Sequence, residues 1–370
     1  MSAVPSCGEP GAVADFHLPG AGRAIISGTV TDLLPIRYRR LAIVGAWAPY
    51  RNEEAYARAA RRLGLTCQVF DVLHWTQRIK GLAAPLIERA IERFEPDFIL
   101  CTRDAQKLGA ARLDRLFHDR ATAMWHVDAQ PQAGVLDLAR RCRTVYLTVA
   151  SQRERYRAAG VDAARFLPAA MEPTRDLPAA RTRTAYRCDV SFVGSGPYPD
   201  RWPVLRAVAA ACRLQIRGPG WRGLDAALPV VGGPVHGRSF AEVVRGAGVS
   251  LGASAMTEQE QQFPSASDRM WRIMGCGGAF VGAYVPGIER FARQEEHCLW
   301  YQSIDECVDQ VRALLADPAR TTAMAARGRE HALAHHTYDQ RMALLLRDGE
   351  YPDGVSDVAP AVAPIPLRNF

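Results

Sequence analysis

Short apolar runs alternate with amphipathic helical patterns along most of this chain. Residues 41–45, 67–72 and 97–101 are apolar runs, and helical patterns at 52–63 and 82–94 separate them. Runs of this kind are typical of strands buried on both faces, and helical crossovers join such strands in parallel sheets. A second series of the same kind starts at residue 190. The sequence therefore predicts an α/β protein with two Rossmann-like, doubly wound parallel sheets.

A stretch with little apolar content, 173–187, separates the two series. A chain of 370 residues is also longer than one typical hydrophobic core supports, which favours two domains. The predicted parts are an N-terminal extension at 1–37, a first domain at 38–172, a linker at 173–187, a second domain at 188–336, a final helix at 337–350 and a disordered tail at 351–370.

Four capping boxes mark predicted helix starts, because a Ser or Thr is followed three residues later by Glu or Gln. They are Ser151 with Glu154, Ser239 with Glu242, Ser303 with Glu306, and Thr337 with Gln340.

The net charge of +7 comes almost entirely from arginine, because Lys80 and Lys107 are the only lysines. A basic surface attracts phosphates, anionic membranes or nucleic acid. Since no Arg/Lys-rich stripe interleaves with aromatics, we do not expect a nucleic-acid partner. Peripheral membrane association stays open.

The composition indicates a cytoplasmic protein. No apolar run is long enough to span a membrane, and residues 1–19 lack the basic start and apolar core of a secretory signal. The nine cysteines are scattered singly, which is typical of small core residues in a reducing compartment.

The segment 267–281 carries the strongest functional signal. Ser267 is a good helix N-cap, Arg269 lies in the first turn, and Gly277 and Gly278 follow the helix before a buried strand. Free backbone N–H groups, a positive dipole end and a forked cation suit a diphosphate. An ordinary glycine-capped helix is the alternative.

Other loops that follow predicted strands are weaker candidates, since ligands of doubly wound folds bind beyond the carboxyl ends of strands. The candidates are Gly194 and Ser195, Arg217 and Gly218, His236, and Pro286 with Gly287 and Glu289. The alternatives are a tight turn without a ligand at the first site, a surface turn with a packing tryptophan at the second, and a structural role for the histidine.

His126 and Asp128 end a strand of the first series and point to the same side under strand alternation. Either is a candidate general base for an acceptor hydroxyl. A structural hydrogen bond between them is the alternative.

His331 and His335 share a helix face, as metal ligands can. No carboxylate or cysteine near them completes a ligand set, so we expect no metal and interpret these residues and His336 as a solvated helix end. We expect no cofactor.

The chain resembles the GT-B glycosyltransferases, specifically the CgeB-like, "glycosyl transferases group 1" type. The matching motifs are 189–195, 267–278, 284–291, 301–303 and 328–341, with a vaguer match across 38–170 around residues 125–128.

This resemblance implies two Rossmann-like domains that face a cleft, with the final helix crossing back to the first domain. The second domain would hold a nucleoside-diphosphate sugar and the first an acceptor. No metal is required, because helix dipoles and basic side chains, here Arg269, offset charge on the leaving diphosphate.

One residue departs from the family. Many relatives have a glutamate three residues after the arginine, where this chain has Arg272. A nucleotide-sugar epimerase of the same fold and a non-catalytic nucleotide-sugar-binding protein therefore remain alternatives to a bacterial glycosyltransferase. The sugar, the base, the acceptor (glycan, lipid, protein or small molecule), the stereochemistry and the oligomeric state stay open.

Overall fold

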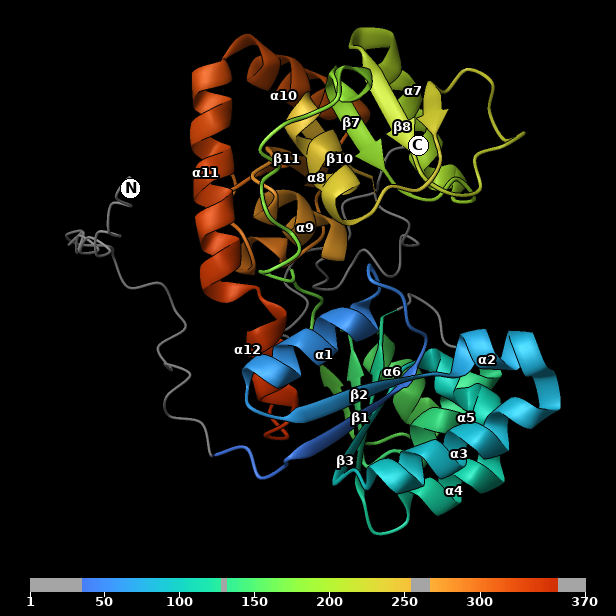
Figure 1. The fold of residues 1–370 in the computed structure, drawn as a ribbon. Coiled ribbons are helices and arrows are strands. Elements are labelled where there is room, and N and C mark those ends of the chain that lie inside the picture. Colours follow the sequence, from blue (N-terminus) through green and yellow to red (C-terminus); the bar gives the residue numbers. More distant parts are fainter. Residues whose placement is uncertain (1–34, 128–131, 254–266, 352–370) are drawn as a thin grey trace, which may run out of the picture. The chain divides into compact units, whose positions relative to one another are not determined.

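Two parallel β-sheets organise the part of the chain that the structure, a computed structural model, describes: residues 35–127, 132–253 and 267–351. These residues belong to one compact unit that begins at Pro35. The first sheet has the strand order β2-β1-β3-β4-β5-β6, and the second β12-β11-β10-β7-β8-β9 (Figure 1). All neighbouring strands pair in parallel, so each sheet gathers its carboxyl ends at one edge.

The first sheet is covered on both faces because its strands are apolar on both sides. Leu41 and Ile43 of β1 pack into one core cluster, while Ala42 and Val44 pack into another. The strands are β1 Arg40–Gly45, β2 Thr66–Asp71, β3 Phe98–Cys101, β4 Ala121–His126, β5 Thr144–Leu147 and β6 Ala164–Phe166. The helices are α1 Asn52–Arg62, α2 Val72–Ile79, α3 Ala83–Phe94, α4 Ala110–Phe117, α5 Ala133–Arg141 and α6 Gln152–Ala158, with 3-10 turns η2 Lys80–Leu82 and η3 Arg103–Leu108.

The second sheet has the strand order of the dinucleotide-binding fold, since β7 to β12 lie in the order 3-2-1-4-5-6 from the β9 edge. Its strands are β7 Cys188–Val193, β8 Leu214–Arg217, β9 Val230–Gly232, β10 Ala247–Gly252, β11 Phe280–Ala283 and β12 Leu299–Tyr301. The helices are α7 Trp202–Ala211, α8 Gly237–Gly246, α9 Asp268–Gly275, α10 Ile304–Ala316, α11 Pro318–His335 and α12 Tyr338–Leu345, with 3-10 turns η4 Thr184–Tyr186, η5 Pro199–Arg201 and η7 Ile288–Arg290. In this order the direction of chain progression reverses between β7 and β10, which is where ligands of such folds bind.

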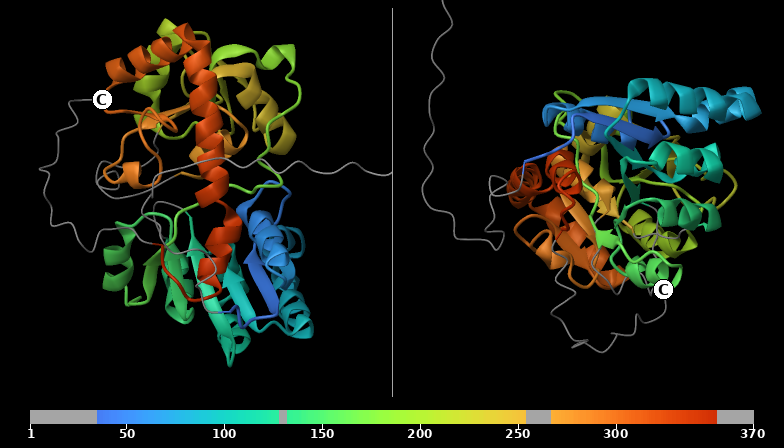
Figure 2. Two further views of the ribbon diagram at one scale, coloured as in Figure 1. Left: turned by 90° about the vertical axis from the view of Figure 1, so that its left-hand side faces the viewer. Right: turned by 90° about the horizontal axis from the view of Figure 1, so that it is seen from below.

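The last helix returns to the first half, as the resemblance implies. Thr337 forms an isolated bridge with Met171, and α12 then packs against α1. Figure 2 shows α11 leading into α12 beside the first sheet. Tyr338 of α12 lies against Tyr56 and Trp125, with ring centroids 5.1 and 5.9 Å away. One hydrophobic cluster therefore runs through β1, α12 and α9 and joins the halves.

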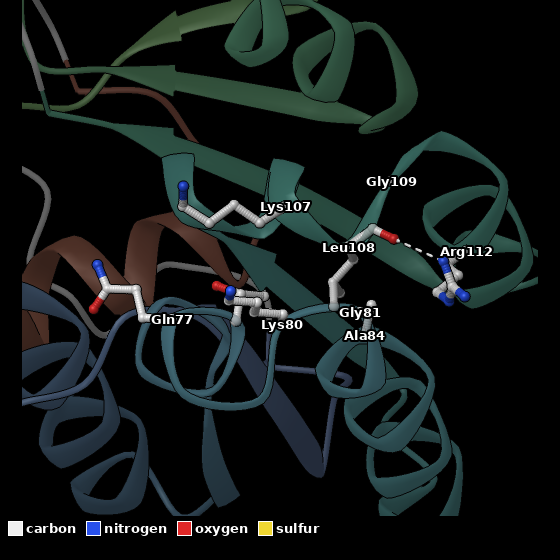
Figure 3. Close-up of a pocket in the computed structure, with 9 residues that line it drawn as sticks. Gln77, Lys80, Gly81, Ala84, Lys107, Leu108, Gly109 and Arg112 are labelled. Atoms are coloured by element: carbon white, nitrogen blue, oxygen red, sulfur yellow. Dashed lines mark hydrogen bonds between the residues drawn. The ribbon is translucent and has the colours of Figure 1, made fainter.

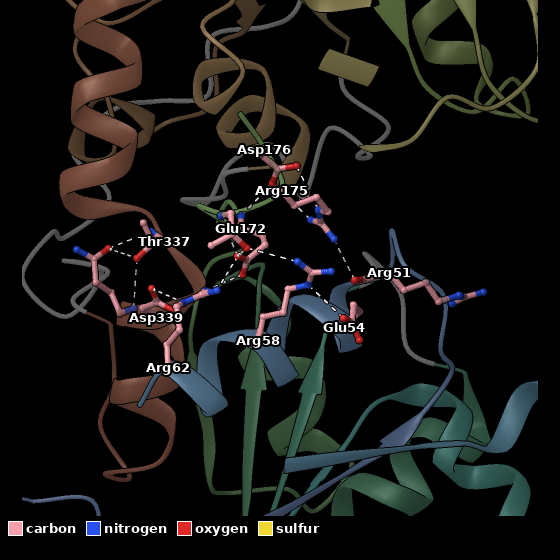
Figure 4. Close-up of polar contacts among 11 residues, drawn as sticks. Arg51, Glu54, Arg58, Arg62, Glu172, Arg175, Asp176, Thr337 and Asp339 are labelled. Carbon is pink, nitrogen blue, oxygen red and sulfur yellow. Dashed lines mark hydrogen bonds and ion pairs between the residues drawn. The ribbon is translucent and has the colours of Figure 1, made fainter. Parts of the chain in front are cut away.

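An ionic network ties α1 to the chain segment between the halves and to α12 (Figure 4). Arg62 pairs with Glu172 at 2.8 Å and with Asp339 at 2.6 Å. Glu172 is fully buried, and Arg175 donates to the Arg51 carbonyl at 3.2 Å. Paired, buried charges hold this joint in one geometry, because losing a partner would leave a charge uncompensated.

Two of the four predicted capping residues cap a helix in the structure. The box of Thr337 and Gln340 is confirmed, and Ser303 caps α10 by accepting from the Glu306 amide at 3.1 Å. The other two boxes do not form: α8 begins at Gly237, before Ser239, whereas α6 begins as predicted after Ser151, although the Ser151 side chain does not cap it.

No helix among the described residues has the length and apolar character needed to cross a bilayer. The predicted extension at 1–37 and tail at 351–370 lie almost wholly outside the described residues.

Candidate functional site

The loop after β7 lies at the point where the strand order of the second sheet reverses. Backbone hydrogen bonds fix the path of this loop. The Gly194 amide donates to the Arg217 carbonyl and the Gly196 amide to the Pro219 carbonyl, each at 2.9 Å. Trp221 Nε1 donates to the Gly194 carbonyl at 2.8 Å. The loop is thus rigid, and the amides of Gly194 and Gly196 are already used within the protein.

Gly218 shows why glycines are needed here. Its φ is +149°, and a Cβ built on it would stand 2.0 Å from the Gly194 carbonyl oxygen. Only a residue without a side chain lets the loops after β7 and β8 come this close.

The N-terminus of α9 approaches the same loop. Ser267 caps the helix as predicted, accepting from the Arg269 amide at 3.3 Å. The guanidinium of Arg269 lies over the Phe192 ring, 4.9 Å from its centroid, and donates to the Ala253 carbonyl at 3.2 Å. Its Nη2 would be 2.8 Å from a Cβ on Gly194. The structure therefore brings Ser267, Arg269 and Gly194 together.

A second arginine, which the sequence reasoning missed, joins this group. Arg201 of η5 is buried and donates to the Ser195 carbonyl at 2.9 Å. Burial, and then repulsion from Arg269, lowers the pKa of Arg201 to about 9. Two cations held near each other away from water repel, so an anion bound between them would relieve that repulsion.

A buried tyrosine lies near the two arginines. Tyr301 is buried and donates its hydroxyl to the Gly252 carbonyl at 3.1 Å. Burial raises its pKa well above the usual value, against the opposing effect of Arg269 and Arg201. The phenol thus stays neutral and adds no negative charge beside the two arginines.

Two other predicted ligands point elsewhere. The Arg217 side chain lies over the Tyr186 ring at 4.5 Å and donates to the Ala185 carbonyl. His236 precedes α8 and stacks on Tyr50 of the first half, with centroids 3.7 Å apart. Their role as donor ligands stays a prediction.

The glycines after α9 lie at the opposite end of the helix from Arg269. Eight helical residues span about 12 Å, and Gly277, with a φ of +76°, donates to the Met274 carbonyl as a helix terminator. A Cβ on Gly278 would stand 2.4 Å from Val244. These glycines have clear structural roles, and donor binding by them stays a prediction.

The loop after β11 follows the carboxyl end of that strand, as the sequence predicts. Gly287 is left-handed, with a φ of +84°, and starts η7, which contains Glu289. Burial, and then the Glu289 carboxylate, raises the pKa of Tyr284. Pro286, Gly287 and Glu289 remain candidates to face a donor sugar.

His126, at the end of β4, is buried, and its Nδ1 lies 3.0 Å from the Tyr156 hydroxyl. Asp128 lies outside the described residues. A general base at either residue stays a prediction.

The histidines near the end of α11 correct one expectation. His336 is 1% exposed, stacks on Trp271 with centroids 3.7 Å apart, and accepts from Arg341 through Nδ1 at 2.8 Å. It is a core residue rather than part of a solvated helix end. The described residues hold no group of three or more His, Cys, Asp or Glu placed to bind a metal.

Arg272, the departure from the family, also has a structural partner. Its Nε lies 3.4 Å from Asp176 in the segment between the halves, and its guanidinium covers the Phe240 ring at 4.5 Å. Although burial disfavours the charged form, Asp176 raises the pKa of Arg272. This residue therefore anchors α9 to the inter-half segment.

Comparison with known proteins agrees with this geometry. Residues 201–347 match the family described as "Glycosyl transferase-like". No curated protein matches in sequence.

Solved structures show the same fold at low identity. HepE from Anabaena, in complex with UDP and glucose, is 12% identical with a TM-score of 0.58 over 83% of this chain and 98% of that one. Sucrose-phosphate synthase from Thermosynechococcus elongatus is 14% identical, with a TM-score of 0.58 over 83% and 97%. AviGT4, a glycosyltransferase of avilamycin A biosynthesis, is 17% identical, with a TM-score of 0.58 over 84% and 96%.

The two predicted Rossmann-like sheets of a GT-B fold are thus confirmed, and the second half carries the predicted similarity to glycosyl transferases. The CgeB-like subtype stays a prediction. The chain has the GT-B glycosyltransferase fold and carries a glycosyl transferase-like segment at residues 201–347.

Proposed function

We propose that this protein transfers a sugar from a nucleoside diphosphate to an acceptor hydroxyl without a metal ion. The observation that carries the proposal is the pair Arg201 and Arg269 beside the Gly194–Ser195 loop, where repulsion between the two lowers the pKa of an already buried Arg201. A diphosphate bound beside both guanidinium groups would offset the repulsion between them. The two arginines then offset the charge that develops on the leaving diphosphate.

UDP is the first nucleotide to test, because HepE was solved with UDP and with UDP-glucose. We propose that Ser267, at the start of α9, orients the diphosphate through its helix amides. Since Arg272 is paired with Asp176, we propose that the donor ribose is held by another residue.

The first half would hold the acceptor, with His126 or Asp128 as the base if the configuration inverts. Asp128→Asn should then lower turnover by about 10²-fold or more. Full turnover in that variant would remove the assignment.

Turnover of UDP-sugars by the purified protein, with and without acceptor extracts, tests the reaction type. Acceptor-dependent release of UDP supports a transferase. Release of UDP and an altered sugar without acceptor indicates an epimerase, and binding without any turnover indicates a non-catalytic protein.

Arg269→Ala tests the site itself. Loss of one stabiliser of the developing charge should slow transfer by about 10²-fold or more. Arg245→Ala, which removes an exposed arginine of α8, is the matched control and should keep the wild-type rate. An Arg269→Ala enzyme as fast as that control would refute the diphosphate role.

A further inference from the structure

Both lysines of this arginine-rich chain line one pocket of the first half. Lys80 and Lys107 are the only lysines among 46 basic residues, and both border a cavity of about 540 Å³. Figure 3 shows Lys107 on one side of the pocket, with Gln77 and Lys80 on the other. The remaining lining residues are Thr76, Gly81, Ala84, Leu108, Gly109 and Arg112.

The lining carries positive charge and no carboxylate. Lys80 and Lys107 are exposed, so both ammonium groups can reach a ligand. Arg112 pairs with Glu88 at 3.2 Å, but Glu88 also pairs with Arg115 at 2.7 Å. One carboxylate between two arginines leaves net positive charge on this side of the pocket as well.

Backbone amide groups add to the positive electrostatic potential of the pocket. Gly81 lies just before the N-cap of α3 and Gly109 is the N-cap of α4, and neither helix has a side-chain cap in the described structure. First-turn amides and the positive dipole ends of both helices therefore lie at the pocket. These amides and dipole ends would add to the attraction of an anion by the two lysines.

Lys80 also has a backbone conformation that lysine rarely adopts. Its φ is +46°, in the region that favours glycine. Backbone preference therefore does not explain a lysine at this position, the C-cap of α2, where a cation complements the helix dipole and also borders the pocket.

We propose that this pocket binds a phosphate group carried by the acceptor. A phosphate monoester has nearly two negative charges and three acceptor oxygens at neutral pH, which match two lysines, Arg112 and two helix N-termini. The lining comes from the segments that follow β2 and β3 along the chain, in the half of the protein that would hold the acceptor. Assigning the phosphate to the acceptor rests on the proposed function, whereas the anion site itself does not.

Titration calorimetry with inorganic phosphate tests the site, with saturating UDP present to occupy the arginines of the second half. We expect Lys80→Gln with Lys107→Gln to weaken phosphate binding by roughly tenfold per lysine. The matched control is Arg89→Gln with Arg93→Gln, which removes two exposed charges of α3 outside the pocket. The control should bind like the wild type, and Lys→Arg at both positions should retain binding.

A second arm identifies the source of the phosphate. Sedimentation with phosphatidylcholine vesicles, with and without phosphatidic acid, whose headgroup is a phosphate monoester, shows whether a lipid headgroup is bound. Lysine-dependent binding to the anionic vesicles alone assigns the site to a headgroup, and lysine-dependent binding of inorganic phosphate assigns it to a soluble phosphate. Equal behaviour of the lysine variant and the arginine control in both arms would overturn the proposal.

The two proposals fail separately. If the wild type does not bind or turn over UDP-sugars but still binds phosphate through the lysines, the anion site stands and its link to an acceptor falls. If UDP-sugars are turned over and phosphate binding does not depend on the lysines, the pocket proposal alone is overturned.

Discussion

Replacement of Arg341 by methionine should strongly destabilise the fold. This arginine of α12 is 1% exposed and donates to the carbonyls of Pro168 at 3.1 Å and His335 at 3.2 Å. It also donates to Nδ1 of His336 at 2.8 Å and lies over the Tyr351 ring at 4.4 Å. Methionine fills a similar volume but donates to none of the three acceptors.

Each buried acceptor left without a donor costs about 1–3 kcal/mol. Removing a buried charge from the folded state offsets part of that loss. We therefore expect Arg341→Met to lower the free energy of unfolding by about 3 kcal/mol or more.

Urea unfolding followed by tryptophan fluorescence measures this difference. Arg312→Met, at an exposed position of α10, is the control and should change stability by less than about 0.5 kcal/mol. An Arg341→Met protein within about 1 kcal/mol of this control would refute the view that Arg341 fastens α12 to the rest of the fold.

Two further predictions concern pH and loop packing. Burial lowers the pKa of His331 to about 4 and that of His336 well below its usual value. Near pH 6.5 these two histidines therefore become protonated in the unfolded chain but stay neutral in the folded protein. Stability should therefore fall as the pH drops from 7 to 5.5, by at most roughly 1.4 kcal/mol per pH unit for each histidine; urea midpoints that stay constant over this range would contradict the burial of these rings. Gly218→Ala should lower the free energy of unfolding by at least about 2 kcal/mol, because of backbone strain and because the new Cβ would lie 2.0 Å from the Gly194 carbonyl oxygen. Gly223 has a φ of +76° and open space around it, so Gly223→Ala should cost less. Equal losses in thermal unfolding would show that the close approach does not matter.

The two-sheet architecture could be predicted because strands buried on both faces are continuous apolar runs. The three-residue strands β9 and β12 were missed, since so short a run carries no readable period. Helix α5, at Ala133–Arg141, was also missed.

The candidate site could be predicted only where its signal is local. Ser267 and Arg269 lie within one helix start, so the sequence shows both. Arg201 lies 68 positions before Arg269 in the numbering, and the two meet only because the fold brings the start of α9 to the loop after β7. Asp176 likewise meets Arg272 only through folding, which is why a residue that departs from the family pattern has a partner that no motif indicates.

The affinity of the protein for UDP compared with that for uridine, in the wild type and in Arg269→Ala, tests the central claim most directly. If Arg201 and Arg269 hold a diphosphate, the variant should lose about tenfold or more in UDP affinity and keep its affinity for uridine. If UDP and uridine weaken equally, or neither changes, the arginines do not bind a diphosphate and the proposed donor site is wrong.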